Sequence, residues 1–213
     1  LDGRMKHRDS RGNAGIVGPG GSQWMTAGRG IIHSEMPEQD RGLMSGFQLW
    51  INLPAKEKLC AQAYQDLAAT ELAEGTVSPA GSKVRVIAGK VDGLIGPVRP
   101  RPTQPLLLTA TLEDERPLEL EVPANHTAIA FVSSGQVEIG ADGASKTVPE
   151  GSLAVLGPGT RMRFRAPTQR SALLIAAARP LGEPIARRGP FVMSTEAELA
   201  QAFADYRAGV LDK

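Results

Sequence analysis

The segment from Gly28 to Glu35 holds the side chains of this chain that are best suited to chemistry. It reads Gly-Arg-Gly-Ile-Ile-His-Ser-Glu, so an imidazole at His33 and a carboxylate at Glu35 stand two residues apart. If Ile31 to Glu35 is extended, the period of two places both side chains on one face of a sheet. Imidazole and carboxylate together suit Fe, Mn, Cu or Zn, so the pair predicts half of a first-row metal site. An ordinary surface pair is the alternative, because a His-x-Glu spacing is common by chance.

The composition is that of a globular protein without a strongly charged partner. Of the 213 residues, 41% are hydrophobic and 22% are charged, and the formal net charge is +1. This balance argues against direct binding to nucleic acid, while weak contact with a DNA-bound protein stays open. No apolar run approaches the ~18 residues of a membrane span. Cys60 is the single cysteine, so no internal disulfide forms, and we interpret it as an ordinary thiol in a cytoplasmic monomer.

Short strands and glycine-rich turns dominate up to about residue 178, which predicts an all-β fold. The segment 46–53 alternates apolar and polar residues and predicts a strand. Helix formers in 54–67 predict a helical turn there, with Tyr64 and Leu67 as anchors. The same reasoning predicts further strands at 83–88, 106–112, 118–122, 127–132, 136–140, 162–165 and 171–178.

Two halves of the chain share one local pattern. An apolar strand runs into Gly-Pro-Gly at Gly18 and again at Gly157, 139 positions later. This recurrence predicts two related β-barrels rather than one sandwich. The segment 89–105 holds three glycines and four prolines and is interpreted as the crossing between the halves. We therefore expect an N-terminal domain at 1–98 and a C-terminal domain at 99–213.

The C-terminal tail changes from strand to helix patterns. Thr195 with Glu198 three positions later fits a capping box, which marks the start of a helix. An apolar stripe at helical spacing follows, formed by Leu199, Ala202, Phe203, Tyr206 and Val210. The stripe fits either a partner protein or docking on the chain's own barrel, and we favour the second interpretation.

Several motifs together resemble the pirin family of bicupins. They are the segment from Trp24 to Pro37, the segment from Gly46 to Pro54, and the shorter motifs His7-Arg8-Asp9-Ser10 and Gly189-Pro190-Phe191-Val192-Met193. The resemblance implies two tandem cupin barrels, each a double-stranded β-helix or jelly roll, with a C-terminal α-helix. It also implies one metal in the N-terminal barrel, usually iron, held by three histidines and one glutamate. His33 and Glu35 match two of these four ligands.

The other two ligands of the family come from a His-Pro-His segment upstream of the Asp-Gly pair at Asp2. This sequence contains no such segment, so we expect residues to be missing before Leu1 and the first barrel to have an open edge. We expect His7 to be solvated or hydrogen bonded rather than a ligand. His126 lies in a turn pattern without a nearby carboxylate, which predicts a second barrel without metal.

Two classes of function follow from the resemblance. The first is a quercetin 2,3-dioxygenase that opens flavonols with O2, with Fe²⁺ or another divalent first-row metal as cofactor. Glu35 would then be both metal ligand and proton acceptor. The second is a non-enzymatic iron and redox sensor that binds a transcription factor or a metabolic enzyme, and an inactive fragment is a third interpretation. Aromatic residues fit a substrate pocket or, as we favour, the core: Trp24, Phe47 and Trp50.

Overall fold

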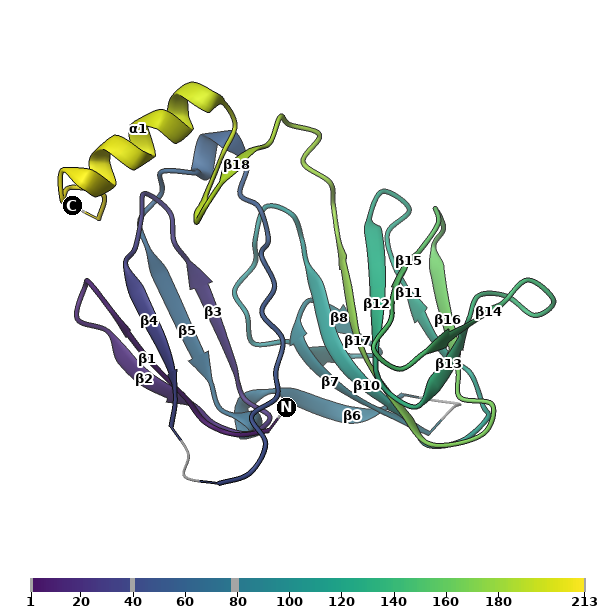
Figure 1. Cartoon of the computed structure of the whole chain (residues 1–213). Coiled ribbons are helices and arrows are strands. Elements are labelled where there is room, and N and C mark those ends of the chain that lie inside the picture. The colour runs from purple at the N-terminus through teal and green to yellow at the C-terminus, as the bar shows by residue number, and fades with distance from the viewer. Residues whose placement is uncertain (1, 39–40, 78–80, 213) are drawn as a thin grey trace. The chain divides into compact units, whose positions relative to one another are not determined.

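The computed structural model describes residues 2–38, 41–77 and 81–212, and these form a mostly β structure (Figure 1). The single α-helix among them is α1 (Glu196–Arg207) near the C-terminus. No helix in the described part of the chain is long and apolar enough to cross a membrane. The predicted class, all-β with a C-terminal helix, is confirmed.

The chain divides into two compact units. The first combines Leu1–Glu71 with Leu181–Lys213, and the second is Leu72–Pro180. The expected boundary between residues 98 and 99 falls inside the second unit, and the C-terminal helix belongs to the first. The two units record which segments of the chain pack together in space. The division into two domains between residues 98 and 99 therefore stays a prediction.

The second unit contains two antiparallel sheets. The six-stranded sheet has the order β15-β12-β17-β10-β7-β6, and the four-stranded sheet has the order β11-β16-β13-β14. The bounds of the first sheet, in that order, are Leu153–Val155, Thr127–Ser134, Ser171–Ala178, Leu106–Leu112, Ser82–Ala88 and Ala73–Val77. Those of the second are Leu118–Glu121, Arg161–Arg165, Gln136–Ile139 and Lys146–Pro149. The seven strands predicted from the pattern in this half are thus confirmed.

An apolar core fills the second unit. Leu108 and Ile175 of the six-stranded sheet and Phe164 and Leu118 of the four-stranded sheet are each 0% exposed and belong to one hydrophobic cluster. Burial of each such side chain contributes about 1.5–3 kcal/mol. Between β7 and β10 in the chain, β8 (Lys90–Val91) and β9 (Leu94–Ile95) form a two-stranded hairpin.

The first unit is built from smaller sheets. One is three-stranded, β2-β1-β4, and the others are the pairs β3-β5 and β18-β19. Their bounds, in that order, are Ala14–Val17, Met5–Asp9, His33–Pro37, Ser22–Thr26, Ala63–Leu67, Ala186–Arg188 and Phe191–Met193. Two short 3-10 helices, η1 (Ala55–Glu57) and η2 (Ala69–Glu71), complete the unit together with α1.

The structure corrects two predictions in this unit. The segment 46–53 belongs to no strand among the described residues, and its apolar side chains Phe47 and Ile51 are 38% and 40% exposed. Alternating apolar and polar residues indicate an amphipathic segment. A β-strand also requires hydrogen bonds between its backbone groups and those of a neighbouring strand. The predicted helical turn in 54–67 is confirmed as η1, whereas Ala63–Leu67 is strand β5, paired with β3. The opening Leu1 lies outside the described residues, and Asp2 forms an isolated bridge to Ser45.

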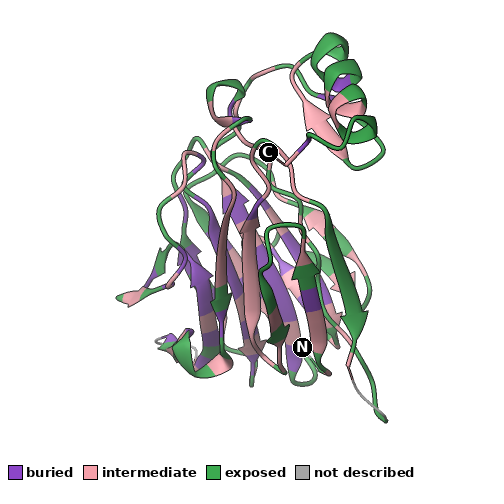
Figure 2. Ribbon diagram, turned by 90° about the vertical axis from the view of Figure 1, so that its left-hand side faces the viewer, coloured by how far each residue is buried: buried purple, intermediate pink, exposed green. Residues whose placement is uncertain are grey.

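Helix α1 begins where the capping box predicts. The Thr195 hydroxyl accepts a hydrogen bond from the backbone N–H of Glu198, and the Glu198 carboxylate accepts one from the backbone N–H of Thr195. Leu199 is fully buried, while most of the helix is exposed (Figure 2). The helix contacts β18 and β19, and the ring of Phe203 meets that of Phe191 edge to face at 4.8 Å. The stripe therefore packs on the chain's own unit.

Replacing Thr195 with alanine removes the hydroxyl that satisfies the first turn of α1. We expect the Thr195→Ala variant to lose about 1 kcal/mol of helix stability. Hydrogen exchange of the α1 amides measures this loss. The Thr195→Ser variant keeps the acceptor and is the control; equal protection of α1 in both variants would contradict the capping role.

Candidate metal site

His33 and Glu35 lie on strand β4 with their side chains on the same face. Their donor atoms, His33 Nδ1 and Glu35 Oε1, are 3.8 Å apart, and the side chains are 29% and 34% exposed. Bonds from a first-row ion to nitrogen or oxygen are about 2.1 Å long, so two donors on one ion lie at most about 4.2 Å apart. The spacing therefore permits a shared ion, and solvent reaches both groups.

The glycines before β4 allow a tight turn into the strand. Gly28 has φ +55°, and a Cβ atom there would collide with the backbone carbonyl of Cys60. Gly30 has φ +140°, and a Cβ atom would lie 2.8 Å from the backbone oxygen of Leu211. Both positions need glycine because of their backbone conformation and because of the close packing. The turn fixes where β4 begins and hence where His33 points.

Strand β1 brings two more ionisable side chains beside the pair. In the antiparallel register His7 lies opposite Glu35, and Asp9 lies opposite His33, so all four share one face of the sheet. The Gln48 amide donates a long hydrogen bond of 3.4 Å from Nε2 to Oε2 of Glu35. The surroundings of the predicted ligands are therefore polar, and this face carries two carboxylates and two imidazoles.

His7 is buried and links the two larger sheets of the unit. It is 3% exposed, and its Nε2 lies 3.2 Å from Oδ2 of Asp66 on β5, in hydrogen-bonding geometry. The other oxygen of Asp66 accepts a hydrogen bond of 2.8 Å from the Gln23 amide on β3. The ring of Tyr64, also on β5, stacks on that of His7 at 6.1 Å between centroids. The hydrogen-bonded interpretation of His7 is confirmed.

The described residues provide two donor groups for a metal at this site, the imidazole of His33 and the carboxylate of Glu35. No group of three or more His, Cys, Asp or Glu side chains in the ranges 2–38, 41–77 and 81–212 is placed to hold an ion. His33 and Glu35 fit a metal in chemistry and spacing, but only as half of a ligand set. Their role as ligands stays a prediction.

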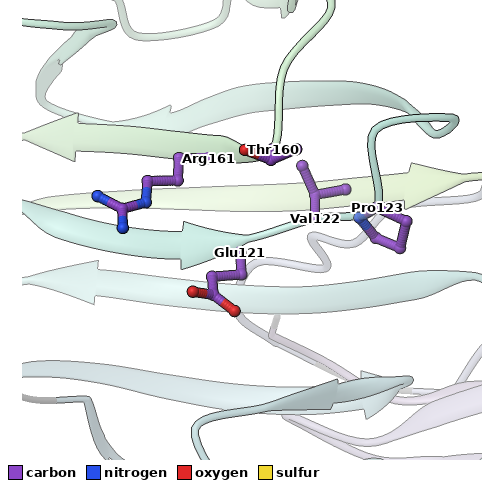
Figure 3. Close-up of a pocket in the computed structure, with 5 residues that line it drawn as sticks. All are labelled: Glu121, Val122, Pro123, Thr160 and Arg161. Carbon is purple, nitrogen blue, oxygen red and sulfur yellow. The ribbon is translucent and has the colours of Figure 1, made fainter.

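The second unit presents a different set of groups. An open pocket there is lined by Glu121, Val122, Pro123, Thr160 and Arg161, with the acidic and basic side chains on adjacent strands (Figure 3).

Within the same unit both ring nitrogens of His126 are buried without a hydrogen-bond partner among the described residues. Burial, and then the charge of Arg179, lowers the pKa of His126. A neutral imidazole is therefore favoured at this position.

Sequence reasoning missed some residues around the pair and misplaced others. Asp66 and Tyr64 alternate in Ala63–Leu67, so a strand prediction for this segment would have put both on one face. The core interpretation is wrong for Phe47 and for Trp50, which is 57% exposed with the guanidinium of Arg187 5.0 Å from its ring centroid. Trp24 is half-buried.

Comparisons with known proteins give consistent matches. The family described as Pirin matches residues 1–51, and the Pirin C-terminal cupin domain matches residues 107–212. A pirin-like protein of Caulobacter vibrioides is 42% identical over 98% of this chain and 74% of its own length. A Pseudomonas aeruginosa protein with the provisional name quercetin 2,3-dioxygenase is 40% identical over 99% of this chain and 74% of its own length.

Solved structures agree with these matches. The crystal structure of a quercetin 2,3-dioxygenase from Acinetobacter baumannii is 28% identical, with a TM-score of 0.85 over 99% of this chain and 73% of that chain. The Escherichia coli bacterial pirin YhhW, solved in complex with nickel(II), has a TM-score of 0.59 at 21% identity over 84% of this chain and 69% of its own. The predicted fold of two cupin domains is confirmed.

Gly15 makes room for the hydrogen bond between His7 and Asp66. A Cβ atom at Gly15 would collide with Nε2 of His7 and lie 2.9 Å from Oδ2 of Asp66. We expect Gly15→Ala to break this buried contact and to lower the free energy of unfolding by about 1–3 kcal/mol. Urea denaturation measures the change. Gly18→Ala is the control, because a Cβ there meets nothing within 4 Å; equal stability of both variants would contradict the prediction.

Proposed function

Because this chain belongs to the pirin family, we propose that it is an iron-dependent dioxygenase that opens flavonols such as quercetin. The observation that carries the proposal is the placement of His33 Nδ1 and Glu35 Oε1 3.8 Å apart on one solvent-accessible face. Relatives named as quercetin 2,3-dioxygenases support the choice of substrate class. Fe²⁺ is the metal we propose, and another divalent first-row ion is the alternative.

In the proposed reaction His33, Glu35 and Gln48 have different roles. A bound divalent ion would act as a Lewis acid on the oxygen atoms of the flavonol. His33 contributes a neutral nitrogen ligand, and Glu35 contributes an oxygen that either binds the ion or accepts the proton of the flavonol hydroxyl. Gln48 holds one oxygen of Glu35 by a weak hydrogen bond, which leaves that carboxylate free to change partners. The family pattern has two further histidine ligands, and we propose that tight binding requires donors in addition to this pair.

Metal binding depends on the pair in this proposal. We expect Ni²⁺ or anaerobic Fe²⁺ to bind the protein, and the His33→Ala and Glu35→Gln variants to bind at least about tenfold more weakly. Isothermal titration calorimetry measures the affinities. His126→Gln and Glu121→Gln are matched controls in the second unit and should bind as the unchanged protein does. Equal affinity in all five proteins would place the metal elsewhere.

Turnover is the second expectation. Under air, the iron-loaded protein should consume quercetin, seen as loss of the flavonol absorbance with release of carbon monoxide. The Glu35→Gln variant should lose this activity because it lacks the proton acceptor, whereas Glu121→Gln should retain it. A protein that binds iron at His33 and Glu35 but leaves quercetin unchanged would contradict the enzyme proposal and favour the regulatory one.

A further inference from the structure

Three neighbouring strands of the second unit bring two arginines and a histidine together at one end of the six-stranded sheet. The strands are β12, β17 and β10, which lie side by side (Figure 1). The first residue of β12 is paired with the last residue of β17, so His126 and Arg179 follow at neighbouring positions just beyond the two strands. The backbone N–H of Arg179 donates a hydrogen bond of 2.8 Å to the carbonyl of Thr103, shortly before β10 begins. We call Arg101, His126 and Arg179 the strand-end cluster.

The side chain of Arg179 connects the other two members of the cluster. Its Nη2 donates a hydrogen bond of 2.7 Å to the carbonyl of Pro102, next to Arg101 in the chain. A hydrogen bond of 2.9 Å from the backbone N–H of Gln104 to the carbonyl of Arg101 closes this turn. On its other side, the charge of Arg179 contributes to the lowered pKa of His126, after burial. Arg179 is itself exposed, so solvent reaches the cluster.

Two members of the cluster have buried nitrogens without a partner. They are Nε of Arg101 and both ring nitrogens of His126, none of which has a hydrogen bond within the described ranges. Buried polar groups in folded proteins are nearly always hydrogen bonded, because an unpaired one loses its water without replacement. No acidic side chain in the described part of the chain pairs with Arg101 or Arg179. By contrast, Arg165 of the same unit is 2.6 Å from a carboxylate oxygen of Glu138.

Stabilisation of the turn before β10 is the simpler interpretation of these residues. It accounts for Arg179, whose guanidinium and backbone N–H both bind carbonyls of that turn. It leaves the N–H of Arg101 and the nitrogens of His126 without a partner, and it leaves two guanidinium charges without a counter-charge. A bound anion would supply both an acceptor and the counter-charge.

We propose that the strand-end cluster binds a small oxyanion, namely a carboxylate or a phosphate group. Arg101 and Arg179 are the ligands, because guanidinium groups present their N–H donors in a fork that matches two oxygens of such an anion. Arg101 turns its buried N–H towards the anion, and side-chain rearrangements of this kind are common on binding. His126 adds a donor in its protonated form, which a neighbouring negative charge favours. The site lies wholly within the second unit and does not depend on the proposed metal or its reaction.

Titration of the metal-free protein with inorganic phosphate and with acetate tests the proposal. The ionic strength is held constant with chloride, and NMR follows the imidazole signal of His126 and the Nε–H signal of Arg179. We expect a saturable shift of both signals with at least one of the two anions. Arg101→Gln and Arg179→Gln should each bind that anion at least about tenfold more weakly, since each variant loses a charge-assisted hydrogen bond.

Arg170→Gln is the matched control. Arg170 lies at the opposite end of β17 and is paired with Glu113 at 3.1 Å, so its replacement removes the same charge from the same unit without touching the cluster. Saturation by phosphate alone or by acetate alone would support the site and assign the class of its ligand. The absence of saturation with both anions would overturn the proposal. Equal affinities in the unchanged protein and the two cluster variants, or an equal loss in Arg170→Gln, would overturn it as well.

A measurement on the unchanged protein covers the case in which the cluster variants do not fold. The chain has three histidines, so its imidazole spectrum separates His126 from His7 and His33. A saturating concentration of the bound anion should shift the His126 signal and leave the other two in place. Shifts of similar size in all three signals would indicate a general effect of the salt and would contradict the proposal.

Discussion

The hydrogen bond between His7 and Asp66 is the interaction on which the candidate site depends. It joins β1 of the three-stranded sheet to β5 of the neighbouring pair, and Asp66 extends the connection to Gln23 on β3. Because β1 is also paired with β4, the same bond couples the strand that carries Glu35 to β5. The bond is nearly inaccessible on the His7 side, where a buried polar group without a partner would be costly. Gly15 is part of this arrangement, since any side chain there would occupy the space of the bond.

Acidic side chains gather around the two imidazoles at this face. Asp9, Glu35 and Asp66 bring three carboxylates around the imidazoles of His7 and His33. A divalent ion bound at His33 and Glu35, as proposed, would offset the negative charge of these carboxylates. Burial raises the pKa of Tyr64, and a hydrogen bond to Asp9 and the charges of Asp9, Asp66 and Glu35 raise it further, so the phenol stays protonated.

Different interactions stabilise the two units. The second unit is held by a large apolar cluster shared by two sheets. The first unit relies more on buried polar contacts, of which Lys58 is a second example. Its ammonium group donates hydrogen bonds to Oδ1 of Asn52 at 2.6 Å and to the carbonyl of Val192 at 3.3 Å. Burial lowers the pKa of Lys58, while the charges of Glu198 and Glu183 oppose this shift. The contact connects the segment before η1 to β19 and thereby to the C-terminal helix.

The sequence by itself determined the local features of this protein. Periodicity located seven strands of the second unit, the capping box located the start of α1, and the His-x-Glu spacing placed His33 and Glu35 on one face. These features depend on residues close together in the chain, so the local pattern is sufficient. Only the tertiary structure decided that 46–53 forms no strand among the described residues, that Ala63–Leu67 is a strand, and that Asp66 meets His7 59 residues away. Such contacts depend on which sheet each strand joins, and that choice is made by packing between distant segments rather than by local preference.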